Sequence, residues 1–342
     1  MFYRSINQFR NVVKYVNHVS KTTATPLPTI AFDVTTKIHG TNGGIKIHGD
    51  GTVEAMSRKT LLIDGADNHG FAKFVETNKH HFQRYALQSK SDTTYIFGEW
   101  CGKGIQSGVA VSEVEKTFVM FESVTEDIDG IIKPRPLREV YNELNAAPMH
   151  RAYMEELNND RIYFIWQFHN ELITIDFADT LDVGNKLNYM VDLVAKIEAE
   201  CPVGKYFGIE STGEGIVVKP ADKPANFRFG DLCFKVKGKK HSNSKVKTTA
   251  SVDVEALASL HEFLDYAVTP NRVAQAVFEL GVDVDSPSAQ SRTGDVIKWV
   301  IVDVIKEESD TMEESGIDRK ILGKNAPAVV RNHFFNLLGW DS

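Results

Sequence analysis

The chain has 342 residues, a formal net charge of −7, 42% hydrophobic residues and 25% charged residues. These values exclude a disordered or fibrous protein, and the length exceeds one ordinary hydrophobic core, so we expect a larger and a smaller globular domain. The three cysteines, Cys101, Cys201 and Cys233, form no Cys-x-x-Cys pair. This pattern argues against a disulfide framework or a cysteine zinc site and favours a reducing cytoplasm.

The first 20 residues predict an amphipathic helix. Arg4, Arg10 and Lys14 interrupt its apolar residues, so the segment lacks the continuous apolar run of a signal peptide. No other segment approaches the roughly 20 apolar residues that span a bilayer. The sequence therefore predicts no membrane role and a cytoplasmic location.

Short alternating apolar runs, separated by Gly, Asp and Asn, indicate antiparallel strands through the first two-thirds of the chain. The alternation at 30–34 resumes at 45–47 after a glycine-rich turn, which predicts a small meander. Further strands are expected at 95–100, 118–124, 161–168, 172–177, 215–219 and 232–237, and a helix at 187–197.

Beyond about residue 249, apolar residues recur every three or four positions, which is typical of helices. Thr269 is placed to cap a helix that begins at Pro270 and ends before Gly281. We therefore expect an α+β fold. An antiparallel-sheet domain would span residues 1–245, and a small all-helical C-terminal domain would span residues 246–342.

Lys37 is unusually placed, because it ends a predicted strand and enters a turn with Gly40 and Gly43. Such glycines let a ligand approach the backbone closely, and the amine would point into the adjoining cleft. A free lysine has a pKa of about 10.4, so a nucleophilic lysine needs neighbouring cations or burial to lower that value.

Lys235 and Lys237 are the candidate cations. They alternate with Phe234 and Val236, so both amines share one face of a strand, where a triphosphate would be a natural partner. An exposed edge strand protected by lysines is the alternative. From residue 235 to 247 the chain holds six lysines, one histidine and no acid, which fits either a surface for a polyanion or a solvated loop.

Three other segments supply further parts of a nucleotide pocket. Glu99 is placed to accept hydrogen bonds from ribose hydroxyls at a strand end. Phe118 and Phe121 lie three residues apart on a strand, so one can stack on a base while the other packs in the core. Glu214 precedes a strand and offers carboxylate oxygens to a divalent metal.

The order and wording of these segments resemble the six signature motifs of the covalent nucleotidyltransferases, which include DNA ligases, RNA ligases and mRNA capping enzymes. The matching segments are Lys37-Ile-His-Gly40, Ser57-Arg58-Lys59, Phe97-Gly98-Glu99, residues 117–123, Glu214-Gly215 with 217–219, and Phe234-Lys235-Val236-Lys237. DNA ligases usually carry Asp two places after the lysine, whereas this chain has His39 and resembles the RNA ligase 2 branch. Residues 268–272 resemble the helical C-terminal domain of that branch.

The resemblance implies a role for each motif residue. Lys37 would attack the α-phosphate of ATP and carry AMP as a phosphoramidate, and His39 would serve the later transfer of AMP to an RNA 5′-phosphate. The nucleotide-binding set implied is Lys37, Asn42, Arg58 (phosphate or ribose), Glu99 (ribose), Phe118 (adenine), Glu214, Lys235 and Lys237. Glu214 would bind Mg²⁺ or Mn²⁺, and Lys235 and Lys237 would bind the α-phosphate.

An ATP-dependent RNA ligase that joins a 3′-hydroxyl to a 5′-phosphate is therefore expected. Its partner would be RNA in a nicked duplex or an RNA/DNA hybrid, and we expect a monomer, with a phage or bacterial cytoplasm as its setting. A DNA ligase or a capping guanylyltransferase is the main alternative, although both would be expected to carry an oligonucleotide-binding barrel after the last motif. A non-catalytic RNA-binding relative is a third interpretation.

Overall fold

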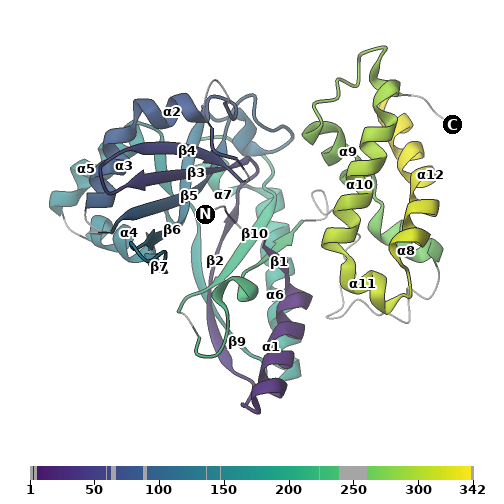
Figure 1. Ribbon diagram of the computed structural model, residues 1–342, viewed down its shortest axis with the longest axis horizontal. Coiled ribbons are helices and arrows are strands. Elements are labelled where there is room, and N and C mark those ends of the chain that lie inside the picture. The colour runs from purple at the N-terminus through teal and green to yellow at the C-terminus, as the bar shows by residue number, and fades with distance from the viewer. Residues whose placement is uncertain are drawn as a thin grey trace. The chain divides into compact units, whose positions relative to one another are not determined.

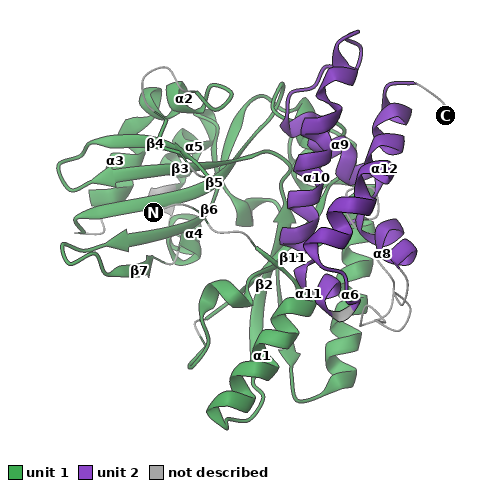
Figure 2. Ribbon diagram, turned by 45° about the vertical axis from the view of Figure 1, so that its right-hand side comes forward, with its two compact units in different colours: residues 1–236 green, residues 237–342 purple. Residues whose placement is uncertain are grey.

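The computed structural model describes residues 3, 6–58, 60–62, 67–87, 91–135, 137–146, 148–222, 224–238 and 260–339. The chain forms two compact units, residues 1–236 and 237–342 (Figure 2). The domain boundary predicted between residues 245 and 246 lies outside the described residues, so it stays a prediction. In the described part of the chain, no helix is long and apolar enough to cross a membrane.

Two β-sheets form the framework of the first unit (Figure 1). Sheet A has the strand order β1 (Asn7–Gln8), β11 (Phe234–Lys237), β10 (Gly215–Pro220), β2 (Thr29–Lys37) and β9 (Asn170–Asp176). Sheet B has the order β4 (Val53–Ser57), β3 (Thr41–His48), β5 (Thr93–Cys101), β6 (Thr117–Glu126) and β7 (Ile132–Arg135), and β8 (Ile162–Phe164) also pairs with β6. Antiparallel pairing joins each of four strands to both of its neighbours in these two strand orders, namely β2, β3, β5 and β6. The α+β prediction with antiparallel sheets is confirmed.

One face of sheet A packs against α1 (Phe9–Thr23) and α6 (Thr180–Ala199). Alternation along β2 sends Phe32 and Val34 into this apolar core, together with Ile216 and Val218 of β10. Because successive strand residues point to opposite faces, Thr35 and Lys37 lie on the other face of the sheet. One face of sheet A is therefore occupied by the hydrophobic core, and the polar side chains of β2 lie on the opposite face.

One face of sheet B is covered by short helices, namely α2 (Phe71–Thr77), α3 (Lys79–Leu87), α4 (Leu137–Ala146) and α5 (Pro148–Asn159). Ile45, Ile96 and Phe164 enter the core beneath them. Another short helix, α7 (Pro202–Tyr206), begins with Pro202 at its first turn. The sequence pattern did not predict these five helices, each of which spans 5 to 12 residues.

The described part of the second unit is helical. It contains α8 (Leu260–Ala267), α9 (Pro270–Glu279), α10 (Thr293–Glu307), α11 (Ser309–Glu314) and α12 (Arg319–Leu337), packed around one apolar core. The Thr269 side chain accepts a hydrogen bond from the backbone N–H of Arg272, and Gly281 has a φ of +60° just beyond the helix. Both predicted signals of α9 are therefore confirmed.

The strand predictions at 95–100, 118–124, 172–177 and 215–219 are confirmed to within about two residues at each end. The strand predicted at 161–168 is wrong in length, since β8 ends at Phe164 and a 3-10 turn, Ile165–Gln167, follows. The N-terminal helix and the helix near 187–197 are present as α1 and α6.

Candidate active site

Lys37 lies where the chain passes from one sheet to the other. It is the last residue of β2 in sheet A, and β3 of sheet B begins four residues later at Thr41. Gly40 makes this crossing possible, because a Cβ there would lie 2.4 Å from the carbonyl oxygen of Trp100. The glycine-rich sequence thus brings Lys37 to the junction of the two sheets.

Glu214 is the direct partner of Lys37. Its Oε2 lies 2.7 Å from Lys37 Nζ and 3.0 Å from His39 Nδ1. The strand register explains this convergence, because Gly215 at the start of β10 is opposite Lys37 at the end of β2. The Glu214 side chain is 2% exposed, against 21% for Lys37 and 27% for His39. A buried carboxylate therefore holds two partly accessible basic groups.

Glu99 and Asn42 extend the site onto sheet B, where they are opposite each other in the β3–β5 register. Burial raises the pKa of the Glu99 carboxyl above its usual range, against the charges of Lys37 and Arg58, which lower it. Asn42 is 7% exposed, and its Oδ1 has no hydrogen-bond partner among the described residues. An unsatisfied buried oxygen is costly in a folded protein unless another molecule supplies its partner.

Arg58 follows β4 directly and is exposed. The positive charge of Arg58 lowers the pKa of Glu99. This residue of the predicted motif is therefore close enough to the site to interact with Glu99 electrostatically. Lys59, the next residue of that motif, lies outside the described residues.

Lys235 lies on the same face of sheet A as Lys37. Its neighbours Phe234 and Val236 pack into the apolar core of that sheet, so the intervening lysine points to the other face. β11 is next to β10, whose Gly215 is opposite Lys37. Lys237 is the last residue of the same strand.

The assignment of the adenine ring to Phe118 is wrong. Phe118 is fully buried, is opposite Trp100 in the strand register, and packs with Phe71 and Phe82 beneath the short helices. Glu99 is opposite Val119. Because adjacent strand residues alternate in direction, Phe118 faces away from Glu99, on the far side of sheet B.

Phe121 is the aromatic residue on the face that carries Glu99. A β-bulge places Phe97 opposite Glu122 and Gly98 opposite Met120, so Phe121 is the extra residue between them. The ring is partly buried among apolar residues that include Val119 and Phe97. A bulge re-aims side chains near a site, and sequence spacing alone does not reveal it.

Glu122 forms an ion pair with Lys219 beside Phe121. Lys219 Nζ lies 2.8 Å from Glu122 Oε2 and 4.6 Å from the centre of the Phe121 ring. Burial lowers the pKa of Lys219, but the charge of Glu122 and other groups raise it to a net value above the ordinary one. The Tyr3 hydroxyl also donates to Glu122 at 3.3 Å. This cluster joins β10 of sheet A to β6 of sheet B.

The donors gathered at the sheet junction fit a hard divalent cation. Glu99 and Glu214 offer carboxylate oxygens, and the Oδ1 of Asn42 offers an amide oxygen that lacks a partner among the described residues. Oxygen donors of these kinds suit Mg²⁺ or Mn²⁺. The two antiparallel sheets and the lysine at their junction agree with the arrangement expected from the nucleotidyltransferase motifs.

The family follows from comparison of the sequence. The profile of the RNA ligase family matches residues 31–237, which is more than half of the chain. The protein therefore belongs to the RNA ligase family. A comparison with curated proteins finds none that matches.

Solved structures resemble the chain more distantly. A Naegleria gruberi RNA ligase with PPi is 15% identical, with a TM-score of 0.41. A mutant form of a Naegleria gruberi RNA ligase with ATP and Mn is 14% identical, also with a TM-score of 0.41. Both comparisons cover 70% of this chain and 56% of the other. The chain thus spans just over half of the length of these structures.

Proposed function

We propose that the protein is an ATP-dependent RNA ligase of the RNA ligase 2 branch, which joins a 3′-hydroxyl to a 5′-phosphate. The observation that carries this proposal is the convergence of Lys37 and His39 on Glu214 at the sheet junction. The amine of Lys37 is held toward a buried carboxylate rather than toward bulk solvent. A nucleophile in a partly enclosed site, beside side chains suited to phosphate and ribose, suits covalent catalysis.

The proposed reaction has three displacements at phosphorus. Lys37 Nζ attacks the α-phosphorus of ATP, a P–N bond forms, the amine loses its proton and pyrophosphate leaves. An oxygen of the RNA 5′-phosphate then attacks the same phosphorus, and the P–N bond breaks as the amine regains a proton. Finally the 3′-hydroxyl attacks the activated 5′-phosphorus and AMP leaves. His39 is assigned to the second displacement.

The remaining side chains would hold the nucleotide in place. Glu99 would accept hydrogen bonds from ribose hydroxyls, and Phe121 would take the place first assigned to Phe118 against adenine. Arg58, Asn42, Lys235 and Lys237 would contact the ribose or phosphates. Fixed positive groups at a phosphate stabilise charge that develops during displacement.

Glu214, together with Glu99 and Asn42, would bind Mg²⁺ or Mn²⁺. The bound ion would neutralise phosphate charge during displacement. We further propose nicked duplex RNA or an RNA/DNA hybrid as substrate, a monomeric protein and a phage or bacterial cytoplasm. The three cysteines are buried thiols, which agrees with a reducing compartment.

Incubation with ATP labelled at the α-phosphate tests the central step. We expect an acid-labile protein–AMP adduct that is lost in Lys37→Ala. Lys46→Ala is the matched control, because Lys46 also lies on a strand, pairs with a glutamate and is 28% exposed. It should form the adduct as wild type does. Absence of the adduct, or its survival in Lys37→Ala, would contradict the proposal.

Substrate comparisons separate the alternatives. A capping guanylyltransferase would form its adduct with GTP rather than ATP, and a DNA ligase would seal nicked DNA in preference to nicked RNA. A non-catalytic relative would bind RNA without forming any adduct. Nicked duplexes with RNA or DNA on each side of the break would also define the strand preference.

A further inference from the structure

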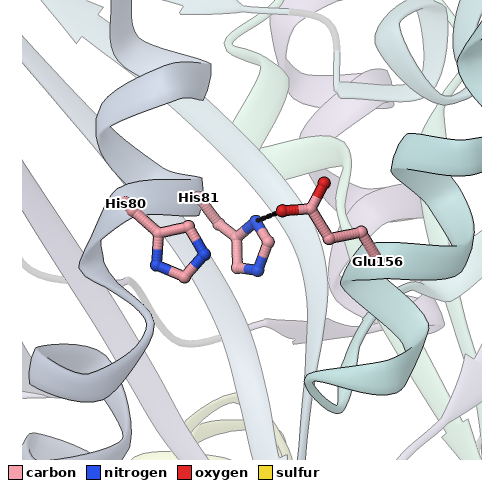
Figure 3. A group of neighbouring side chains, drawn as sticks. All are labelled: His80, His81 and Glu156. Atoms are coloured by element: carbon pink, nitrogen blue, oxygen red, sulfur yellow. Dashed lines mark ion pairs between the residues drawn. The ribbon is translucent and has the colours of Figure 1, made fainter.

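A second group of ligand-type side chains lies on two of the helices that cover sheet B, on the face opposite Glu99. His80 and His81 come from α3, and Glu156 comes from α5 (Figure 3). One ligand atom from each residue lies within 4.8 Å of the other two. In the described part of the chain, this is the one group of three such residues that could hold a metal ion.

His81 is oriented by a carboxylate. Its Nε2 lies 2.7 Å from Asp160 Oδ2, and its side chain is 1% exposed. An ionised carboxylate only accepts hydrogen bonds, so Nε2 carries the proton and donates it to Asp160. In the neutral ring the remaining nitrogen, Nδ1, then presents a lone pair. A carboxylate on the far nitrogen is the usual arrangement behind a metal-binding histidine.

The Nδ1 of His81 is buried and has no hydrogen-bond partner among the described residues. Glu156 Oε1 lies 3.9 Å from it, which is beyond hydrogen-bond length. A lone pair that faces a carboxylate oxygen is electrostatically unfavourable, and a cation between the two atoms removes that conflict. His81 also borders a cavity of about 20 Å³ whose other walls are mainly apolar, including Tyr153 and Leu157.

The donor set selects the class of metal. Two imidazole nitrogens and one carboxylate oxygen suit Zn²⁺ and related transition metals better than Mg²⁺ or Ca²⁺. Tetrahedral zinc with bonds of about 2.0–2.1 Å places its ligand atoms about 3.4 Å apart. The 3.9 Å between His81 Nδ1 and Glu156 Oε1 is close to that value. His80 and Glu156 are exposed, so their side chains can adjust.

We propose that His80, His81 and Glu156 form a transition-metal site, with Zn²⁺ as the ion, that joins α3 to α5. Asp160 is a positioning residue that acts through His81. Arg84 Nη1 lies 3.7 Å from Glu156 Oε2, so it competes for the same carboxylate and moderates the affinity. This site is separate from the Glu214 region and would stabilise the helical cover of sheet B.

Cobalt titration of the full-length protein tests the site. After treatment with a chelator and dialysis into metal-free buffer, Co²⁺ is added as a visible probe and then displaced with Zn²⁺. Wild type should gain the absorption bands of tetrahedral Co²⁺, and His80→Ala and Glu156→Gln should lose them. Asp160→Asn should weaken binding about 10- to 100-fold. Zn²⁺ should raise the melting temperature of wild type but not that of His80→Ala.

Two controls separate this site from others. His18→Ala removes an exposed histidine on α1 and should titrate as wild type does, and Glu214→Gln should keep the Co²⁺ absorption. Circular dichroism of each variant checks its folding. If His81 instead carries a second proton and bridges the two carboxylates as a cation, wild type binds no Co²⁺ in tetrahedral form. That result, or equal binding by His80→Ala and Glu156→Gln, overturns the proposal.

Discussion

The helical unit and the sheet unit each bury a cluster of charges, but they satisfy these charges differently. In the helical unit, Arg272 is 1% exposed and donates to Asp303 at 2.9 Å, to Glu308 at 3.2 Å and to the carbonyl of Ala267. Tyr266 donates to the other Glu308 oxygen at 3.1 Å. Every arm of the Arg272 guanidinium group is therefore bonded within the unit.

The cluster around Glu214 is arranged differently. Lys37 and His39 share one carboxylate oxygen, both side chains remain partly exposed, and the Oδ1 of Asn42 has no partner among the described residues. Buried polar networks that are fully satisfied hold a fold together, whereas incomplete ones are found where a protein binds something else. The Arg272 network is thus complete within the helical unit, whereas the group around Glu214 leaves a buried oxygen available to a ligand.

Arg272→Met should have the largest effect on stability. It leaves Glu308, which is 0% exposed, without its main cationic partner. Breaking a buried ion pair on one side costs about 3–5 kcal/mol, so amide hydrogens of α9 and α10 should exchange about 10²- to 10⁴-fold faster. Hydrogen-exchange mass spectrometry measures this directly. Adding Glu308→Gln should recover part of the loss, and unchanged exchange in Arg272→Met would contradict the structural role.

Glu214→Gln should reduce adenylylation far more than stability. The rate of adduct formation from labelled ATP should fall about 10²- to 10³-fold, as when one preorganised electrostatic contact is removed from an active site. The melting temperature should change little, because the amide retains an oxygen that can accept from Lys37. Adduct formation at the wild-type rate would contradict a catalytic role for Glu214. A loss of stability as large as that of Arg272→Met would show that the Glu214 cluster is structural as well.

A pair of leucine substitutions sharpens the contrast between the two faces of sheet B. Phe121→Leu should raise the KM for ATP about three- to tenfold, because an aromatic contact contributes about 0.5–1.5 kcal/mol beyond burial. Phe118→Leu should instead lower the free energy of unfolding by about 1 kcal/mol and leave that KM unchanged. The reverse outcome, with KM sensitive to Phe118, would restore the original assignment.

Glu99→Gln should stabilise the protein at neutral pH. Burial raises the pKa of Glu99 in the folded state, so its contribution to stability is complete below the unfolded pKa of about 4.3 and is lost as pH rises through the folded value. Glutamine does not titrate and avoids that loss. Thermal unfolding should show a higher melting temperature for Glu99→Gln than for wild type at pH 8. This difference should disappear as the pH is lowered to 4. Glu279→Gln, at an exposed position, serves as the control.

Part of the site could be located from sequence because it depends on local patterns. Lys37 follows an alternating strand and precedes glycines, and Lys235 alternates with core residues, so both positions follow from the two-residue period of a strand. The same period indicated that Phe118 and Phe121 face opposite ways. It did not indicate which ring shares a face with Glu99, because that depends on a bulge between Phe97 and Gly98.

The sequence by itself determined the motif residues, the strand alternation and the helical character of the C-terminal unit, since each depends on neighbours within a few positions. Only the tertiary structure decided that Glu214 pairs with Lys37 across 177 positions and that Glu122 pairs with Lys219. It also decided that His81 lies against Asp160 and Glu156. These contacts depend on the register of the strands and the packing of short helices, and neither leaves a local pattern in the sequence.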